Sequence, residues 1–213
     1  RRNLSDSINF ILNGGLNGIF IVFDGKAILG TRARKVRSKS FAAFDSIGYP
    51  IAAFIDDSRI IKYLEAPAVS GEVRFAASIS DSVFLLKLIP GIRPEILAYL
   101  GEHYDIIVIE SYGVGGIPFY DKRNFLNELQ ALTEKSKIIV IATQVMLEGS
   151  DAEKYEVGAL ALDRYNVLQS FDMTVESAVT KLMWLCAEHE GYEEIRDGFY
   201  KCINHDLLYD PKN

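Results

Sequence analysis

Long apolar runs and an excess of basic residues are both missing from this 213-residue sequence. No run of apolar residues approaches the roughly 20 that a membrane-spanning helix needs, so we expect no membrane partner. The formal net charge of −6 disfavours a nucleic-acid binder, because such domains are normally basic. With 49% hydrophobic residues, the chain is predicted to be globular and to bury a substantial core.

Cysteine and histidine are too few and too scattered to suggest a metal centre. Cys186 and Cys202 lie in helical patterns without Cys-x-x-Cys spacing, so the sequence predicts buried thiols rather than a disulfide. We therefore expect a reducing compartment, the cytoplasm. His103, His189 and His205 form no ligand motif, so no metal is expected, and nothing in the sequence indicates another cofactor.

The first residues predict a helix followed by a hairpin. Apolar residues at helical spacing, followed by Asn13-Gly14-Gly15, predict an amphipathic helix over residues 2–13. Asp24-Gly25 is a two-residue turn signal between two apolar runs. It predicts strands at residues 18–23 and 26–29 that pair antiparallel.

Two small domains are predicted, joined by a linker. Residues 65–73 contain the turn-forming residues that are typical of a linker. Before it, residues 41–46 are predicted to be a packed loop, and residues 51–64 are predicted to hold two short strands. The predicted domains are therefore residues 1–64 and residues 74–213.

The second domain alternates strands with helices. Strands are predicted at 83–89, 105–109 and 138–142, and helices at 94–100, 125–132, 155–162, 175–186 and 195–202. Crossovers of this length suit parallel pairing, and the continuous β-branched runs suit strands that are buried on both faces. The sequence therefore predicts an α/β fold with helices layered on a parallel sheet.

Polar loops follow two of these strands. Glu110 and Ser111 are predicted to end the strand at 105–109, and the glycines after them favour a sharp turn. Ligands of open α/β sheets bind at the carboxyl ends of strands. A nucleotide cradle and a simple glycine turn are alternatives, since the full dinucleotide-binding spacing is absent. The candidate substrate-binding or interface residues are Ser111, Tyr112, Gly115, Gly116, Thr143 and Gln144.

Five basic residues lie between positions 32 and 39. Such a run is usually a solvated loop, and a phosphate-binding patch is the alternative. Lys35 lies among arginines, whose positive charge favours the neutral amine that a general base requires. Arg32 and Arg37 are predicted to be solvated members of the same loop. Lys35 is therefore the candidate catalytic residue.

Several short motifs occur in a characteristic order along the chain. They are Gly30-Thr31-Arg32-Ala33-Arg34-Lys35, Ala43-Phe44-Asp45-Ser46, Ser111-Tyr112-Gly113-Val114-Gly115, Thr143-Gln144, Tyr155-Glu156-Val157-Gly158 and Asp172-Met173-Thr174-Val175-Glu176. In this order they resemble the L-asparaginases, particularly the cytoplasmic bacterial type I branch. For the fold, the resemblance implies the C-terminal part of the asparaginase nucleophile domain, followed by a smaller flavodoxin-like α/β domain.

The resemblance also implies an activity. Its members are amidohydrolases that cleave the side-chain amide of L-asparagine through a threonine acyl-enzyme. Lys35 aligns with a lysine that shares a hydrogen-bonded group with a threonine and an aspartate. The resemblance further implies a homo-oligomer, a dimer or a tetramer, because family active sites are closed by a neighbouring subunit. No nucleic-acid partner is expected.

Two departures from the family pattern bear on this activity. The sequence contains neither the Thr-Gly-Gly-Thr segment of the nucleophile nor the His-Gly-Thr-Asp-Thr segment of its partners. Gly116 also stands where the family commonly has asparagine. We expect the 213 residues to be inactive by themselves. The alternatives are an asparaginase-like subunit of a tRNA-dependent amidotransferase and a non-catalytic module for amino-acid binding or oligomerisation.

Overall fold

The computed structural model describes residues 1–65, 75–154 and 156–209, which form two compact units. Unit 1 consists of the described residues of Arg1–Phe75 together with Ile203–Asp206. Unit 2 consists of the described residues of Ala76–Cys202 together with those from Leu207 onward. The predicted linker is residues 65–73. Of these only Glu65 is described, because residues 66–74 lie outside the described residues. The domain boundaries stay a prediction.

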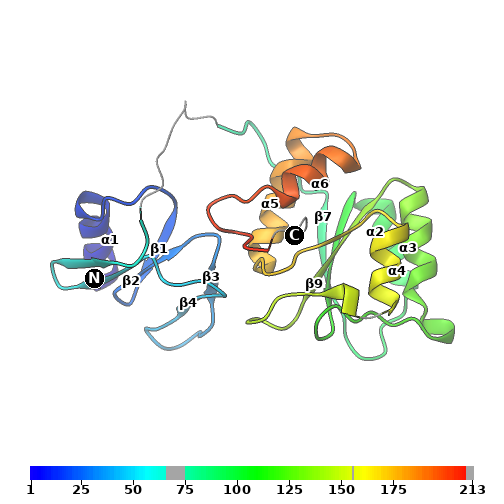
Figure 1. Cartoon of the computed structure of the whole chain (residues 1–213), viewed down its shortest axis with the longest axis horizontal. Helices are drawn as coiled ribbons and strands as arrows, with labels where there is room; N and C mark the ends of the chain where they lie inside the picture. The colour runs from blue at the N-terminus through cyan, green and yellow to red at the C-terminus, as the bar shows by residue number, and fades with distance from the viewer. Residues whose placement is uncertain (66–74, 155, 210–213) are drawn as a thin grey trace. The chain divides into compact units, whose positions relative to one another are not determined.

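Unit 1 opens with a helix and a hairpin (Figure 1). α1 spans Arg2–Asn13, and β1 (Phe20–Phe23) pairs antiparallel with β2 (Lys26–Leu29). Asp24 and Gly25 have φ angles of 51° and 73°, the positive values that a type I′ turn requires at both central residues. The predicted helix and hairpin are confirmed.

Two further strand pairs complete unit 1. β5 (Ala53–Asp56) and β6 (Arg59–Lys62) extend the hairpin into a sheet of order β1-β2-β5-β6, and these are the two short strands that were expected there. β3 (Ala33–Lys35) and β4 (Phe44–Ser46) form a separate antiparallel ribbon. The prediction of a loop over residues 41–46 is therefore wrong at its end, because the basic run supplies a strand that pairs with it.

α1 turns its apolar stripe away from the core of unit 1. The core cluster consists of Phe10, Ala27, Ala53 and Ile55, and the Phe10 ring meets Phe20 edge to face at 5.1 Å. The other apolar side chains of the helix are between 50% and 77% exposed; these are Leu4, Ile8, Ile11 and Leu12. Most of the apolar surface that predicts this helix therefore lies outside the core.

Arg32 is fully buried and binds a segment from near the end of the chain. Its Nε donates to the backbone oxygen of His205 at 2.5 Å, and its guanidinium lies 5.7 Å from the Tyr49 ring centroid. The Tyr49 ring stacks on His205 at 5.0 Å, and Thr31 Oγ1 donates to the backbone oxygen of Asn204 at 2.7 Å. The prediction that Arg32 is solvated is wrong, because its guanidinium anchors the returning chain.

Unit 2 is built on a parallel four-stranded sheet. The strands β7 (Val83–Lys87), β8 (Ile106–Ser111), β9 (Ile138–Thr143) and β10 (Val167–Gln169) stand in the order β7-β8-β9-β10, and neighbours are parallel. β8 and β9 are buried along their whole length. The predicted α/β class with a parallel sheet is confirmed. β10 is missing from the prediction because a strand of three residues shows no clear periodicity.

Helices cover both faces of this sheet (Figure 1). α2 (Glu95–His103), α3 (Phe125–Glu134) and α4 (Glu156–Arg164) lie on one face, and the short 3₁₀ turns η1 (Asp121–Arg123) and η2 (Ala152–Lys154) precede α3 and α4. α5 (Val175–Glu188) and α6 (Tyr192–Tyr200) lie on the other face. This layering agrees with the predicted order of strands and helices.

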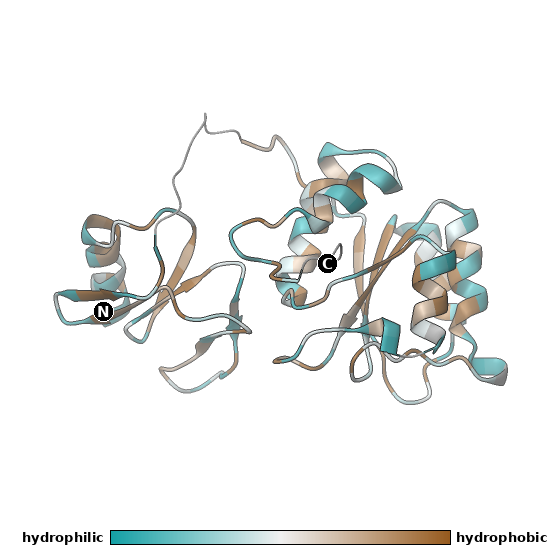
Figure 2. Ribbon diagram, in the orientation of Figure 1, coloured by the Kyte–Doolittle hydropathy of each residue, from teal (hydrophilic) through white to brown (hydrophobic). Residues whose placement is uncertain are grey.

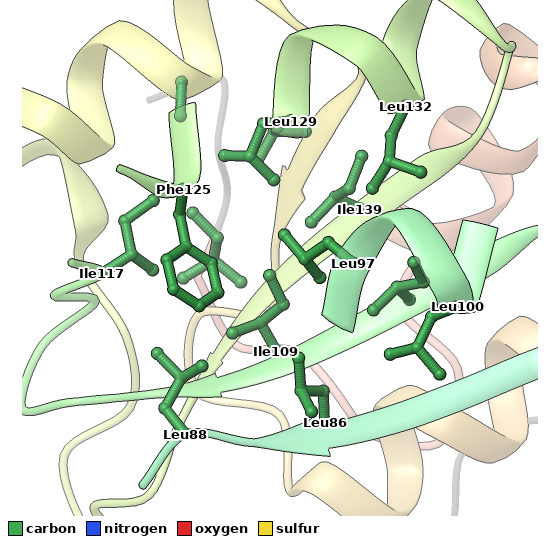
Figure 3. Close-up of a cluster of buried hydrophobic side chains, with 14 of the residues drawn as sticks. Leu86, Leu88, Leu97, Leu100, Ile109, Ile117, Phe125, Leu129, Leu132 and Ile139 are labelled. Carbon is green, nitrogen blue, oxygen red and sulfur yellow. The ribbon is translucent and has the colours of Figure 1, made fainter. Parts of the chain in front are cut away.

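The two faces of the sheet carry separate hydrophobic clusters. Ile107 and Ile109 point into the cluster under α2, α3 and α4, while Ile106 and Val108 point into the cluster under α5 and α6. Figure 3 shows the first cluster, in which Phe125 and Ile109 lie between strand and helix. In Figure 2 the strands of this sheet are mainly apolar, whereas its helices are polar on their outer sides. Burial on both faces explains the continuous apolar runs of the strands.

The cysteines differ from their predicted environment. Both thiols are free, but Cys186 is only partly buried and Cys202 is exposed. The prediction of buried thiols is wrong for Cys202 because α6 ends at Tyr200, two residues earlier than expected. Within the described ranges, none of the helices has the length and apolar character that crossing a bilayer requires. In the same ranges, no group of three or more His, Cys, Asp or Glu residues is placed to hold a metal ion.

The burial of Arg32 generates a stability prediction. Arg32→Met should lower the free energy of unfolding of unit 1 by about 1.5–3 kcal/mol, because it removes a buried hydrogen bond from a charged donor. Arg37→Met is the matched control, because Arg37 is exposed, and it should change stability by no more than about 0.5 kcal/mol. Urea unfolding followed by circular dichroism measures both variants. Equal changes in the free energy of unfolding for the two variants would contradict the anchoring role of Arg32.

Tyr200 generates a pH prediction. Burial raises the pKa of Tyr200 to about 12, although the backbone N–H of Gln169, which donates to its hydroxyl oxygen at 3.0 Å, opposes the rise. The folded state therefore keeps the phenol neutral where the unfolded chain ionises. The associated stability is fully present below pH 10 and is lost as the pH rises towards 12, by roughly 2–3 kcal/mol. Tyr200→Phe, measured by urea unfolding across this range, should show a correspondingly smaller loss.

Candidate functional site

Two polar loops begin side by side at the carboxyl edge of the unit 2 sheet. Ser111 ends β8, Thr143 ends β9, and the two residues are paired in the parallel register. The backbone N–H of Gln144 donates to the backbone oxygen of Ser111 at 3.1 Å. The prediction that Glu110 and Ser111 end the strand is wrong, because β8 runs through both. The remaining candidates, Tyr112, Gly115 and Gly116, belong to the loop after β8.

The hydroxyls of Ser111 and Thr143 are engaged by the backbone. Ser111 is fully buried, and its Oγ donates to the backbone oxygen of Ala142 at 2.6 Å. Thr143 Oγ1 donates to the backbone oxygen of Gly113 and accepts from the backbone N–H of Val145 at 2.9 Å. In the part of the chain that the structure describes, neither hydroxyl has a base hydrogen-bonded to it that would make it a nucleophile. Their role in this arrangement is to hold the two loops together.

Gln144 links three strand ends through its side chain. Its Nε2 donates to the backbone oxygens of Leu88 and Glu110, at 2.7 Å and 3.0 Å. Leu88 follows β7, Glu110 lies in β8, and Gln144 itself follows β9. Both amide protons are therefore used within the sheet edge, which leaves the amide oxygen as the remaining polar atom of this side chain.

The glycine loop is a tight turn whose amides are already bonded. The backbone N–H groups of Gly115 and Gly116 both donate to the backbone oxygen of Tyr112, at 3.2 Å and 2.7 Å. Gly115 has a φ of 141°, and a Cβ there would lie 2.7 Å from the Cα of Ala152, so only glycine fits. A nucleotide cradle needs free amides that point at a phosphate. The bonding of these two amides favours the simple glycine turn over the cradle.

Glu110 and Lys87 are charged residues at this edge that the sequence analysis does not select. Glu110 is only 6% exposed, and Lys87 Nζ lies 3.5 Å from its Oε2 across the β7–β8 pair. The sequence signal that could have identified Glu110 is its position directly after four apolar strand residues. A carboxylate in such a position is expected to be buried and therefore to need a partner. The pair places the buried Glu110 carboxyl group, engaged by the Lys87 amine, beside the two polar loops.

Tyr112 lies beside a cavity of about 320 Å³ at the same edge. The tyrosine is half-buried, and the other lining residues include Ile92, Pro118 and Arg123. The walls are mainly apolar, with the Arg123 side chain as the charged exception. The arrangement at this edge thus offers loop backbone, one aromatic ring and a few charges, and it offers no complete catalytic group.

Lys35 lies in unit 1, apart from the other six candidates. It is the last residue of β3, where it pairs with Phe44 in the antiparallel ribbon, and its side chain is exposed. Among the described residues, no hydrogen bond or ion pair engages its amine. Arg32, three residues earlier, is buried. The ribbon therefore exposes the Lys35 side chain. The backbone just before it is held in place by the buried Arg32.

Both units match known protein families. The sequence model of the Asparaginase N-terminal domain matches residues 1–68, and that of the Glutaminase/Asparaginase C-terminal domain matches residues 82–199. The L-asparaginase of Thermococcus kodakarensis is 38% identical over 195 residues, which are 92% of this chain and 58% of that protein. One subunit of the glutamyl-tRNA(Gln) amidotransferase of Methanosphaera stadtmanae is 30% identical over 173 residues, which are 78% of this chain and 38% of that protein.

The folds agree as well. The solved structure of the thermostable L-asparaginase from Thermococcus kodakarensis superposes with a TM-score of 0.91 at 36% sequence identity, covering 98% of this chain and 62% of that one. The chain thus spans about three fifths of the length of its asparaginase relative. The motifs, the two domain matches and the superposition agree, and the chain belongs to the glutaminase/asparaginase family.

Proposed function

We propose that this chain forms part of an amidohydrolase that converts L-asparagine to L-aspartate and ammonia through a threonine acyl-enzyme. The observation that carries the proposal is the match of both family domains in chain order, at residues 1–68 and 82–199. The relative with 38% identity is named an L-asparaginase, which supports the same substrate. The proposed substrate is a small molecule, and no cofactor or metal takes part. The cytoplasmic location stays a prediction.

Lys35 is the proposed catalytic residue of this chain. Its amine is exposed and unengaged among the described residues, so it is available to a threonine and an aspartate from the part of the enzyme that carries them. A positioned amine that accepts and returns a proton lowers the barrier to forming and hydrolysing the acyl-enzyme. The buried Arg32 acts as a positioning residue, since it holds the chain that leads into β3.

The sheet edge of unit 2 is the proposed substrate-binding or interface element. Ser111, Thr143 and Gln144 act there by fixing loop shape, because their hydrogen bonds are made to strand and loop backbone. Tyr112, Gly115 and Gly116 form the turn that a substrate or a neighbouring subunit would meet. The protein is proposed to be a homo-oligomer, a dimer or a tetramer.

The outward stripe of α1 supports a larger assembled enzyme. Leu4, Ile8, Ile11 and Leu12 form an apolar face that unit 1 does not bury. A contiguous exposed apolar face of this kind marks a packing surface. Under the proposed function, the remaining part of the family's nucleophile domain covers it.

The amidotransferase subunit is the rival within the family, and it also matches over much of this chain. That match is at lower identity and covers less of both proteins than the match to the asparaginase. A non-catalytic module for amino-acid binding or oligomerisation is the rival from another class. Release of ammonia from free asparagine, without tRNA, separates the proposed hydrolase from both.

The 213 residues alone are predicted to release no ammonia from L-asparagine. Neither the Thr-Gly-Gly-Thr nor the His-Gly-Thr-Asp-Thr segment occurs among them, so no acyl-enzyme can form. A coupled ammonia assay on the purified chain measures this. Turnover above the buffer blank that persists through a second purification would contradict the proposed roles.

Lys35 is predicted to carry proton transfer in a complete enzyme. A chimera in which the unmatched N-terminal part of the Thermococcus kodakarensis relative precedes these 213 residues would provide that enzyme. In it, Lys35→Met should lower kcat by roughly 10²-fold or more, the scale of lost general acid–base help.

Arg37→Met is the control in the same chimera, because Arg37 is an exposed cation two residues further along. It should leave kcat within about twofold, as expected for a surface site. Equal and mild effects of the two substitutions on kcat would remove Lys35 from the mechanism. An active chimera with that outcome would still support the amidohydrolase, so the two failures are distinguishable.

A further inference from the structure

The dipeptide Asn-Gly occurs twice in the sequence, at Asn13-Gly14 and at Asn17-Gly18. An asparagine side chain can react with the backbone nitrogen of the next residue, because attack on its Cγ is intramolecular and closes a small ring. A glycine in the second position favours this attack, since it has no Cβ to hinder the approach. The two pairs have the same local chemistry, so the structure around each pair decides whether it reacts.

The fold protects the Asn13-Gly14 pair. Asn13 is the last residue of α1, and its Nδ2 donates to Oδ1 of Asn9 at 2.9 Å. The backbone N–H of Gly14 donates to the backbone oxygen of Phe10 at 2.8 Å, and Gly14 is buried. The attacking nitrogen and the amide that it would displace are therefore both hydrogen-bonded. Reaction at Asn13 requires the last turn of α1 to open first.

The Asn17-Gly18 pair has no such protection. Both residues are exposed, and they lie outside helix and strand, between the end of α1 and the start of β1. Within the part of the chain that the structure describes, no hydrogen bond engages the backbone N–H of Gly18 or the side chain of Asn17. Gly18 has a φ of 131°, which residues with a side chain rarely adopt, so this turn favours the glycine that promotes the reaction.

We propose that Asn17 is a site of spontaneous deamidation and that Asn13 is not. The backbone nitrogen of Gly18 loses its proton to solvent and bonds to Cγ of Asn17. The bond from Cγ to Nδ2 breaks, and Nδ2 takes up a proton and leaves as ammonia, which produces a succinimide. Water then opens this ring. Addition at Cγ gives aspartate, and addition at the backbone carbonyl gives isoaspartate, in which the main chain runs through the former side chain.

The modification changes the chain just before β1. It adds a negative charge at position 17, and the isoaspartate product lengthens the backbone between α1 and β1. It releases at most one ammonia per chain from this position, and it needs neither L-asparagine nor Lys35. The proposed hydrolysis, in contrast, would release ammonia in proportion to the substrate consumed. The inference goes beyond the proposed function and does not depend on it.

Peptide mass spectrometry on the purified chain tests the proposal. Trypsin cleaves after Arg2 and Lys26, so both Asn-Gly pairs lie on one peptide, residues 3–26, and fragmentation assigns the product to its position. The chain is incubated at mildly alkaline pH and then digested briefly at mildly acidic pH, which limits reaction in the peptide. Asn17 should deamidate roughly tenfold faster than Asn13 or more, because reaction at Asn13 first breaks a hydrogen bond and opens a helical turn.

The same chain unfolded in urea is the matched control. Both asparagines are then followed by glycine without the protection of the fold, so their rates should agree within about threefold. Asn17→Ser should abolish the product at position 17 and leave the rate at Asn13 unchanged. Equal rates at the two positions in the folded chain would overturn the proposal. So would a ratio of rates that unfolding does not change, or an Asn17 that reacts only in the unfolded chain.

Discussion

The parallel pairing of β8 with β9 is the constraint on which the candidate site of unit 2 depends. Both strands are buried on both faces, and their isoleucine and valine side chains make the two faces equally apolar. Apolar alternation sets register only when one face is polar, and here it cannot. The polar groups at the strand ends set the register instead. Ser111 Oγ bonds to Ala142 and Gln144 Nε2 bonds to Glu110, and these bonds are satisfied in one register.

This constraint gives the polar residues at the sheet edge a structural origin. A buried hydroxyl or amide without a partner costs about 1–3 kcal/mol, so a slipped register would be penalised at several positions at once. Side chains whose polar atoms are bonded to the strand and loop backbone are not available to act on a substrate. The edge acts on a ligand or a neighbouring subunit through the shape of the two loops, and the residues that carry the reaction have to come from elsewhere in the enzyme.

The place of this edge could be predicted from the sequence, but the partners of its side chains could not. Apolar runs and their spacing indicate parallel strands, and the carboxyl ends of such strands lie together whatever the side chains do. Which carbonyl Gln144 reaches depends on the relative heights of three strands. β10 escaped prediction for a related reason, since its three residues, Val167–Gln169, owe their conformation to the neighbouring β9.

Arg32 and Lys35 show the same limit within a single basic run. Charge patterning treats the two cations alike, yet Arg32 is fully buried and Lys35 is exposed. Their difference comes from Ile203–Asp206, which lies about 170 residues further along the chain and covers only one of them. No local pattern records so distant a contact. The prediction that Arg32 is solvated is therefore wrong, whereas the catalytic role of Lys35 stays a prediction, although both rested on one observation.

The two units also differ in how far their own residues stabilise them. Unit 2 has an apolar cluster on each face of its sheet, which is the arrangement of a self-sufficient α/β domain. Unit 1 has a core cluster of four buried residues, while the larger apolar stripe of α1 faces away from it. Burying that stripe would bring more apolar surface out of water than the Phe10 contact does. Since hydrophobic stabilisation scales with the apolar area removed from water, a partner that covers the outward face of α1 would stabilise unit 1 further.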